Sequence, residues 1–227
     1  MDTDNNLVEE KFFYYTFEGV DKIYKISHKS SSLIPLINEM ILNNPNESSS
    51  VETCLTFPAI LLNDKTREES YQIRREIHDF IERYIAIWKD NIANADYLEI
   101  KSHNTNNPSN IIKNQDLELI EEYKQLLLNK TSEEQKKKFS VSSYYEKYYI
   151  INSFSYLLNE VHGFLNMEGL AKKLYAYISC MLFGCSLNDL AIVINDEEFT
   201  KYIYTTRESN IKEWEDDNLE KIAELTE

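Results

Sequence analysis

Hydrophobic and polar positions near the start of the chain fall in short runs that predict strands. Phe12–Glu18 (FFYYTFE) is rich in aromatic residues, and Lys22–Ile26 (KIYKI) alternates apolar and polar residues. Gly19-Val20-Asp21 separates the two runs and supplies a turn, so we expect a β-hairpin. Cys54–Phe57 has the length of a third strand, and Pro58 ends it.

Helical periodicity follows each of these strand signals. Serines 30–32 precede a predicted first helix, and its apolar positions are Leu33, Ile34, Ile37, Met40 and Ile41. A second helix is predicted over Ile73–Trp88, where apolar residues recur on one face and charged residues occupy the other. The charges assigned to that polar face are Arg74, Arg75, Glu76, Asp79 and Glu82.

The second half of the chain is predicted to be helical, after an Asn-rich surface loop over residues 101–115. A helix is expected around 116–129. Apolar positions with helical spacing then run from Tyr144 to Leu165 and from Leu170 to Met181. Three further short helices are expected in residues 186–227.

This order of elements predicts an α+β fold, with a small three-stranded sheet flanked by helices and a C-terminal helical extension. Residues 1–11 are interpreted as a disordered leader and residues 12–183 as one domain, within which 91–140 forms an insertion that is partly loop. Residues 184–227 are the extension.

Composition and charge narrow the classes of partner. The 227 residues carry a net charge of −15, which argues against nucleic acid, because phosphate binding needs clustered Lys and Arg. The sequence contains no run of about 18 apolar residues, so no membrane span is predicted. Three cysteines form no even disulfide framework, and the N-terminus lacks the basic and then apolar pattern of a secretion signal. We therefore expect a cytoplasmic and/or nuclear protein.

Signals for catalysis and metal binding are weak. Cys180 and Cys185 lie five residues apart, and the sequence contains no CxxC or HxxxH spacing and no GxSxG segment. The four histidines lie in ordinary helix or loop contexts. We predict no catalytic residue, no metal ligand and no cofactor, so the protein is expected not to be an enzyme.

Negative charge is concentrated near the C-terminus. Residues 187–227 hold 12 Asp and Glu against 4 Lys and Arg, and the same segment carries many large apolar residues. Such helices either cover the core of the domain or present an apolar surface to a partner.

An ordered series of segments resembles the S-phase-kinase-associated adaptor family, a branch of the BTB/POZ fold. Gly163–Leu170 (GFLNMEGL) is similar to its NYLDIKGLL signature, and Ala171–Phe183 is similar to the helix that follows it. Three later segments are similar to the TPEEIR, NDFTEEEE and RKEN steps of the family: 186–190, 195–200 and 207–210. The resemblance covers roughly residues 12–90 and 140–217.

The resemblance implies a non-catalytic adaptor that links an F-box substrate receptor to a cullin in an SCF-type ubiquitin ligase. The cullin would contact the first helix and the signature, through Ile37, Met40, Ile41 and Phe164. The F-box would contact the C-terminal helices, through Tyr177, Met181, Leu190, Ile194, Phe199, Ile203 and Trp214.

The sequence departs from the family pattern at four points. Gly163 stands where the family has Asn, and residues 91–140 are longer than the corresponding acidic loop. Ala95–Lys101 (ADYLEIK) is a second copy of the signature, and we take the copy at 163–170 as the true one because the later helices follow it. Trp214 lies about two residues beyond the tail Trp of the family.

Three alternatives stay open. A BTB/POZ self-association module would form a homodimer or bind another cullin without an F-box protein. An enzyme with a dispersed site would need a pocket with perturbed titratable groups. The abundance of Asn, Ile, Lys and Tyr is typical of AT-rich genomes, including those of large DNA viruses, and a viral protein could be a decoy that binds one partner only.

Overall fold

The N-terminal hairpin forms as the alternation of side chains predicts. A computed structural model describes residues 10–58, 61–62, 65–98, 107–141 and 143–182. Strand β1 (Phe12–Phe17) pairs antiparallel with β2 (Tyr24–Ser27), with Phe12 opposite Ser27 and Tyr15 opposite Tyr24. Every second side chain of β1 is buried, because one face of the sheet packs against the core.

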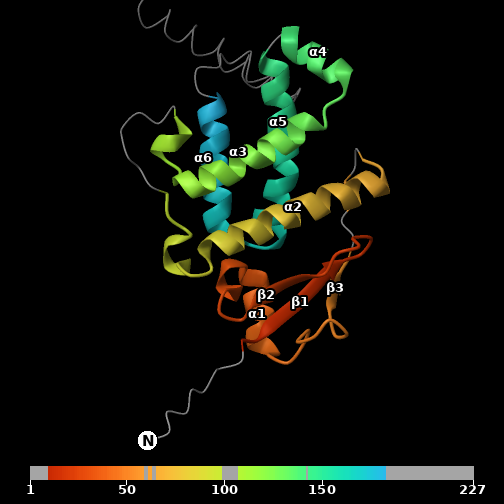
Figure 1. Cartoon of the computed structure of the whole chain (residues 1–227), viewed down its shortest axis with the longest axis vertical. Coiled ribbons are helices and arrows are strands. Elements are labelled where there is room, and N and C mark those ends of the chain that lie inside the picture. Colours follow the sequence, from red (N-terminus) through yellow and green to blue (C-terminus); the bar gives the residue numbers. More distant parts are fainter. Residues whose placement is uncertain (1–9, 59–60, 63–64, 99–106, 142, 183–227) are drawn as a thin grey trace, which may run out of the picture.

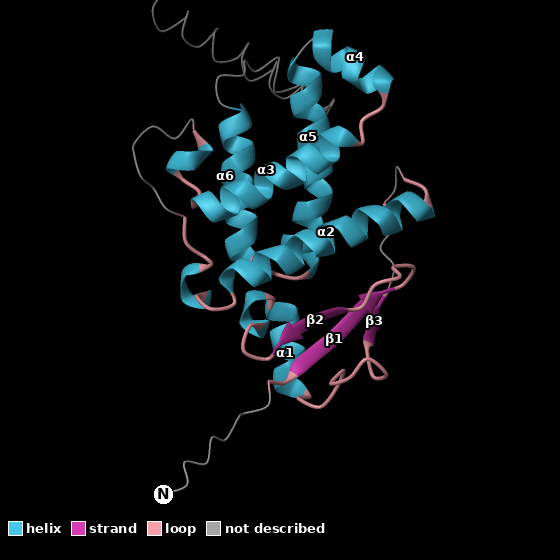
Figure 2. Ribbon diagram, in the orientation of Figure 1, coloured by secondary structure: helices cyan, strands magenta, loops and turns pink. Residues whose placement is uncertain are grey.

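The third predicted strand is confirmed and completes a three-stranded sheet. Strand β3 (Leu55–Phe57) pairs parallel with the other edge of β1, so the strand order is β2-β1-β3. A parallel pairing needs a crossover connection, and helix α1 (Pro35–Asn43) lies in this crossover. Figure 2 shows α1 beside the sheet.

Helix α1 begins later than predicted. Residues Ser31–Leu33 form a 3-10 turn, Ile34 is the N-cap residue, and no side chain caps the helix. Pro35 occupies the first turn of α1, where its missing N–H costs nothing and its fixed φ favours the helix. Proline therefore determines this start, rather than the serine cluster.

Helix α2 (Arg67–Trp88) is the longest element that the structure describes, and it begins six residues before the predicted helix. Thr66 and Glu69 form a capping box that fixes this earlier start: the Thr66 hydroxyl accepts from the Glu69 N–H, and the Glu69 carboxylate accepts from the Thr66 N–H. Figure 1 shows α2 crossing the molecule between the sheet and the remaining helices.

Four helices lie on the side of α2 away from the sheet (Figure 1): α3 (Asn114–Asn129), α4 (Glu133–Val141), α5 (Ser143–Leu158) and α6 (Glu168–Leu182). The predicted helical run from Tyr144 to Leu165 is interrupted, because Asn159–Phe164 forms a π-helical turn, η4. Two short 3-10 turns, Ile92–Asn94 and Pro108–Asn110, lie between α2 and α3.

The predicted surface loop over 101–115 is confirmed for residues 107–111, which form a 3-10 turn and irregular structure, but it extends too far. Ile112 is fully buried, because the apolar pair Ile111-Ile112 packs against the core. Helix α3 then begins at Asn114. Residues 101–106 lie outside the described part, as do 1–9 of the predicted leader and 183–227 of the predicted extension.

A single hydrophobic core joins the sheet to the helices, so the α+β prediction is confirmed. The core includes Phe13 and Tyr15 of the sheet, Ile77 and Ile81 of α2, and residues of each of α3, α5 and α6. Leu119, Ile120 and Tyr123 of α3 are buried in it. The segment 91–140 therefore contributes a central helix to the core, while its interpretation as an insertion stays a prediction.

Candidate protein-interaction site

The two segments that the family resemblance assigns to a cullin lie against each other. Residues 159–167, here termed the Phe164 turn, connect α5 to α6 through η4. The Leu36 N–H of α1 donates to the Leu165 carbonyl of this turn at 3.5 Å. Segments almost 130 residues apart in the sequence are thereby in contact.

The backbone of the Phe164 turn is closed by its own hydrogen bonds. The Leu165 N–H donates to the Glu160 carbonyl at 2.9 Å, and the Met167 N–H donates to the Val161 carbonyl at 2.8 Å. Asn166 has a φ of 57°, in the left-handed region that Asn tolerates better than most residues. This residue lets the chain reverse before α6 begins at Glu168.

Phe164 is half-buried and lies where three elements meet. Its ring meets the Phe57 ring of β3 edge to face, with centroids 5.3 Å apart. The Arg74 guanidinium of α2 lies 5.4 Å from the centroid of the Phe164 ring. One part of the side chain is thus held by β3 and α2, and the rest is accessible to a partner.

The structure separates the predicted cullin residues into two groups. Ile37 and Ile41 are 0% and 7% exposed, so their side chains belong to the core and offer no docking surface. Met40 is half-buried, like Phe164, and the neighbouring Leu42 is 74% exposed. The helical period identified the apolar face of α1, but the core takes the centre of that face and leaves its margin accessible.

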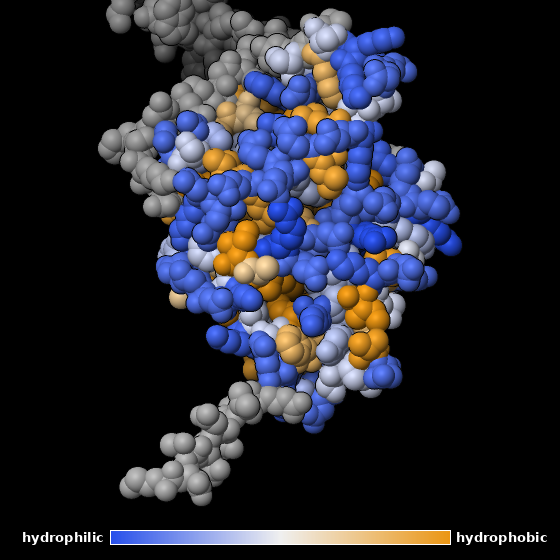
Figure 3. All heavy atoms as spheres, in the orientation of Figure 1, coloured by the Kyte–Doolittle hydropathy of each residue, from blue (hydrophilic) through white to orange (hydrophobic). Residues whose placement is uncertain are grey.

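Figure 3 shows the character of one face of the molecule. Hydrophobic side chains reach this surface in separate patches within a mainly hydrophilic surround. On this face, the hydrophobic side chains therefore form no single broad apolar area.

Behind the Phe164 turn lies a buried ionic cluster that the sequence did not reveal. Arg74 and His78 of α2 both contact one carboxylate oxygen of Glu160 in η4. The Arg74 Nη2 lies 3.0 Å from Glu160 Oε1, and His78 Nε2 lies 2.8 Å from the same atom. Arg74 was assigned to the polar face of its helix, yet it is 4% exposed. We refer to these three residues as the Arg74 cluster.

Aromatic rings surround the Arg74 cluster. The Arg74 guanidinium lies 4.0 Å from the Phe17 ring centroid, and the His78 ring lies 3.9 Å from the same ring. The His78 Nδ1 atom is buried without a hydrogen-bond partner. The cluster is therefore shielded from water and satisfied mainly within itself.

Burial and charge act oppositely on the two titratable members of the cluster. Burial favours the neutral acid at Glu160, but the hydrogen bond with His78 and the charge of Arg74 hold its pKa below the ordinary value. Burial lowers the pKa of His78, outweighing the attraction of Glu160 and Asp79, and Arg74 lowers it further. His78 is therefore neutral, and the Arg74–Glu160 pair carries the charge.

A pH dependence of stability follows from His78. Its neighbours are Tyr15 of β1, Tyr24 of β2, Glu160 of η4, and Arg74 and Asp79 of α2. Because the folded pKa is depressed, the unfolded chain binds more protons below the ordinary value of 6.5, so stability rises with pH.

Lowering the pH from about 7.5 to about 5 should therefore decrease the free energy of unfolding, by at most about 1.4 kcal/mol per pH unit for one proton. Urea denaturation across this range measures it. The variant His78→Gln, which cannot titrate, should show a flatter profile. An equally steep profile in that variant would assign the effect to other groups.

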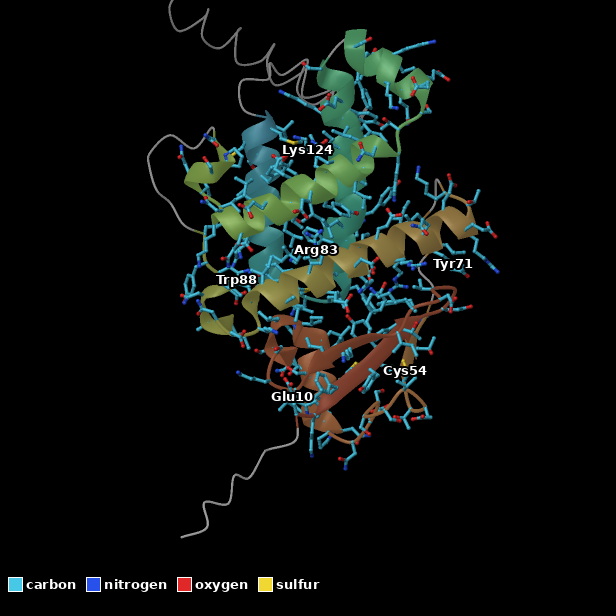
Figure 4. All side chains as sticks on the ribbon, in the orientation of Figure 1. Glu10, Cys54, Tyr71, Arg83, Trp88 and Lys124 are labelled. Carbon is cyan, nitrogen blue, oxygen red and sulfur yellow. The ribbon has the colours of Figure 1, made fainter. Side chains whose placement is uncertain are left out.

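A second buried ionic cluster joins α2, α3 and α6. Lys173 Nζ lies 2.8 Å from Asp116 Oδ2, and the Trp88 indole N–H donates to Asp116 Oδ1 at 2.7 Å. Lys173 Nζ also lies 4.6 Å from the Trp88 ring centroid and 5.0 Å from that of Tyr84. Burial lowers the pKa of Lys173 in spite of Asp116. Figure 4 shows Trp88 at the C-terminal end of α2, while Tyr71 lies near the N-terminal end of the same helix.

The two copies of the signature contact each other beside this second cluster. Asp96, in the copy at 95–101, lies against Gly169, in the copy at 163–170. A Cβ on Gly169 would come within 2.7 Å of the Asp96 Cα. Glycine therefore permits the backbone after α2 to pack on the first turn of α6. A cavity of ≈ 190 Å³ next to this contact is lined by Ser32, Asp96, Asn166 and Glu168, among others.

Most of the residues predicted to bind an F-box lie outside the described part of the chain: Leu190, Ile194, Phe199, Ile203 and Trp214. The other two are at the C-terminal end of α6. Tyr177 is buried and its hydroxyl donates to Glu121 Oε1 of α3 at 2.6 Å, so it supports the core. Met181 is half-buried, and so are Ile178 and Leu182.

Most of the buried charged groups in the described residues belong to the two ionic clusters. The buried Arg, His, Glu and Lys side chains pair with one another within the core, and the described residues bring together no group of three His, Cys, Asp or Glu that could hold a metal ion. In the same part of the chain, no helix combines the length and hydropathy needed to cross a membrane.

Comparisons with protein-family models, curated proteins and solved structures find no significant match.

Proposed function

We propose that the protein is a non-catalytic adaptor with a BTB/POZ-like fold, which links an F-box substrate receptor to a cullin in an SCF-type ubiquitin ligase. The observation that carries the proposal is the contact between α1 and the Phe164 turn. The resemblance assigned these two segments to one partner, and their contact in the fold supports that assignment.

The order of elements supports the same proposal. The hairpin, α1, the parallel strand β3 and α2 follow one another as the resemblance requires, and the signature leads directly into α6. The 15 residues of α6 span about 22 Å at 1.5 Å per residue. The helix therefore separates the Phe164 turn from Leu182, after which the predicted F-box helices follow in the sequence. An adaptor needs two such separated surfaces, because it sets the distance between its partners.

Capture of both partners by the full chain tests this function. We expect stoichiometric binding of an F-box peptide, and of a cullin N-terminal domain, in size exclusion and calorimetry. A chain truncated after Phe183 should keep the cullin and lose the F-box. Phe164→Ala should lower the affinity for the cullin domain by about tenfold, since truncation of an anchor residue typically costs more than 1 kcal/mol of binding free energy.

Leu126→Ala is the matched control, because Leu126 is an exposed apolar residue on α3 that is assigned to neither partner. This variant should bind both partners as the unmodified chain does. Failure of the full chain to capture either partner, together with a dimer on the column, would overturn the adaptor function and favour the self-association module.

A further inference from the structure

We propose that the Arg74 cluster positions the Phe164 turn, so that α2 sets the orientation of the cullin-facing surface. Arg74, Glu160 and His78 are then positioning residues: they act on a partner through Phe164 and touch none themselves. This inference rests on the proposed function in one respect, namely that the turn faces a cullin. The positioning itself can be measured without any partner.

The turn needs an anchor beyond its own backbone. The hydrogen bonds of Leu165 and Met167 close the turn on itself, and the Leu36 N–H attaches its Leu165 end to α1, but none of these bonds joins the turn to α2 or to β3. A π-helical turn adds a residue to the helix repeat, and such turns often occur at functional sites. Glu160 lies in this π-helical turn, and its buried carboxylate is fastened to α2.

Arg74 connects α2 with the Phe164 turn, with strand β1 and with the residue that follows β3. Its Nη1 donates to the Pro58 carbonyl after β3 at 2.6 Å, while its Nε and Nη2 donate to Glu160 at 3.3 and 3.0 Å. The guanidinium plane also lies against the rings of Phe17 and Phe164. One planar group with five fixed donors can satisfy all these contacts together, whereas an ammonium cannot.

The geometry of these contacts explains why a charged cluster occupies this position. An apolar cluster of the same volume would give comparable stability but would fix no orientation, because hydrophobic contacts are not directional. Charge-assisted hydrogen bonds at defined angles allow one register of the turn. His78 adds a third donor to the same Glu160 oxygen, from the next turn of α2.

Arg74→Lys separates positioning from charge, because lysine keeps the positive charge beside Glu160 and loses the fork. Hydrogen exchange of the full chain should show about tenfold faster exchange of the Leu165 and Met167 amides, with the α3 amides unchanged. Cullin affinity should fall by about tenfold while F-box affinity stays constant. Arg83→Lys is the matched control: Arg83 also lies on α2 but forms an exposed pair with Glu122.

Exchange in the Phe164 turn that stays at the wild-type rate in Arg74→Lys would overturn the inference, even if Phe164→Ala weakens the cullin as proposed. Conversely, faster exchange confined to the turn in a chain that binds no cullin supports the positioning and sinks the proposed function. Should Arg74→Lys fail to fold, Glu160→Gln tests the positioning from the other partner. The amide keeps the shape of the side chain and loses the charge that strengthens the hydrogen bonds from Arg74, so the Leu165 and Met167 amides should again exchange faster than in the wild type, with the α3 amides unchanged.

Discussion

Replacing Lys173 by methionine is expected to lower the free energy of unfolding by about 3–5 kcal/mol. Methionine retains the length and much of the volume of lysine, so the loss does not come from a cavity. It comes from Asp116, which is 1% exposed and would be left as a buried carboxylate without its counter-ion. Urea denaturation of the full chain, monitored by circular dichroism, measures the change.

The double variant Lys173→Met/Asp116→Asn identifies the cause. Asparagine keeps the oxygen that accepts from the Trp88 indole and removes the unpaired charge, so most of the lost stability should return. Lys172→Met is the matched control, because Lys172 is exposed and pairs with Glu168 at the surface. That variant should change stability by less than about 0.5 kcal/mol. Equal losses for the single and the double variant would contradict the electrostatic explanation.

Local patterns predicted those parts of the fold that local interactions determine. The alternation in β1 and β2 and the turn at Gly19 identified the hairpin, and Pro58 identified the end of β3. The helix over Ile73–Trp88 was likewise found, although its start was missed because the capping box at Thr66 contains no apolar residue. Each of these signals lies within a few residues of the structure that it determines.

Both buried ionic clusters escaped prediction, because their partners are far apart in the sequence. Arg74 and Glu160 are separated by 86 residues, and no local spacing relates them. A partial signal existed: Arg74 and His78 stand four residues apart and flank Ile77, which belongs to the apolar face. That position indicates partial burial of both side chains, but the identity of the partner requires the tertiary structure.

The candidate interface shows the same limit from the other side. Periodicity selects apolar residues without distinguishing those that fill the core from those that meet a partner. Ile37, Ile41 and Tyr177 proved to be core residues, while Met40 and Phe164 stay partly accessible. The distinction depends on how much of each helix face the neighbouring elements cover.

Arg74→Met is expected to destabilise the protein by about 3–5 kcal/mol, because it leaves Glu160 as a buried charge with only His78 beside it. It also removes the donor to the Pro58 carbonyl and the guanidinium between two aromatic rings. Protonation of His78 at acidic pH would turn its remaining contact with Glu160 into an ion pair. The loss of unfolding free energy caused by Arg74→Met should therefore be smaller at acidic pH than at neutral pH.

The comparison with Arg74→Met/Glu160→Met separates stability from orientation. Removing both charges should recover most of the free energy of unfolding, because methionine pairs pack well and leave no charge unpaired. The exchange rates of the Phe164 turn should nevertheless stay fast, since no directional contact then holds Glu160's position to α2. A double variant that recovers stability and slow exchange together would show that simple burial, rather than the geometry of the ion pair, orients the turn.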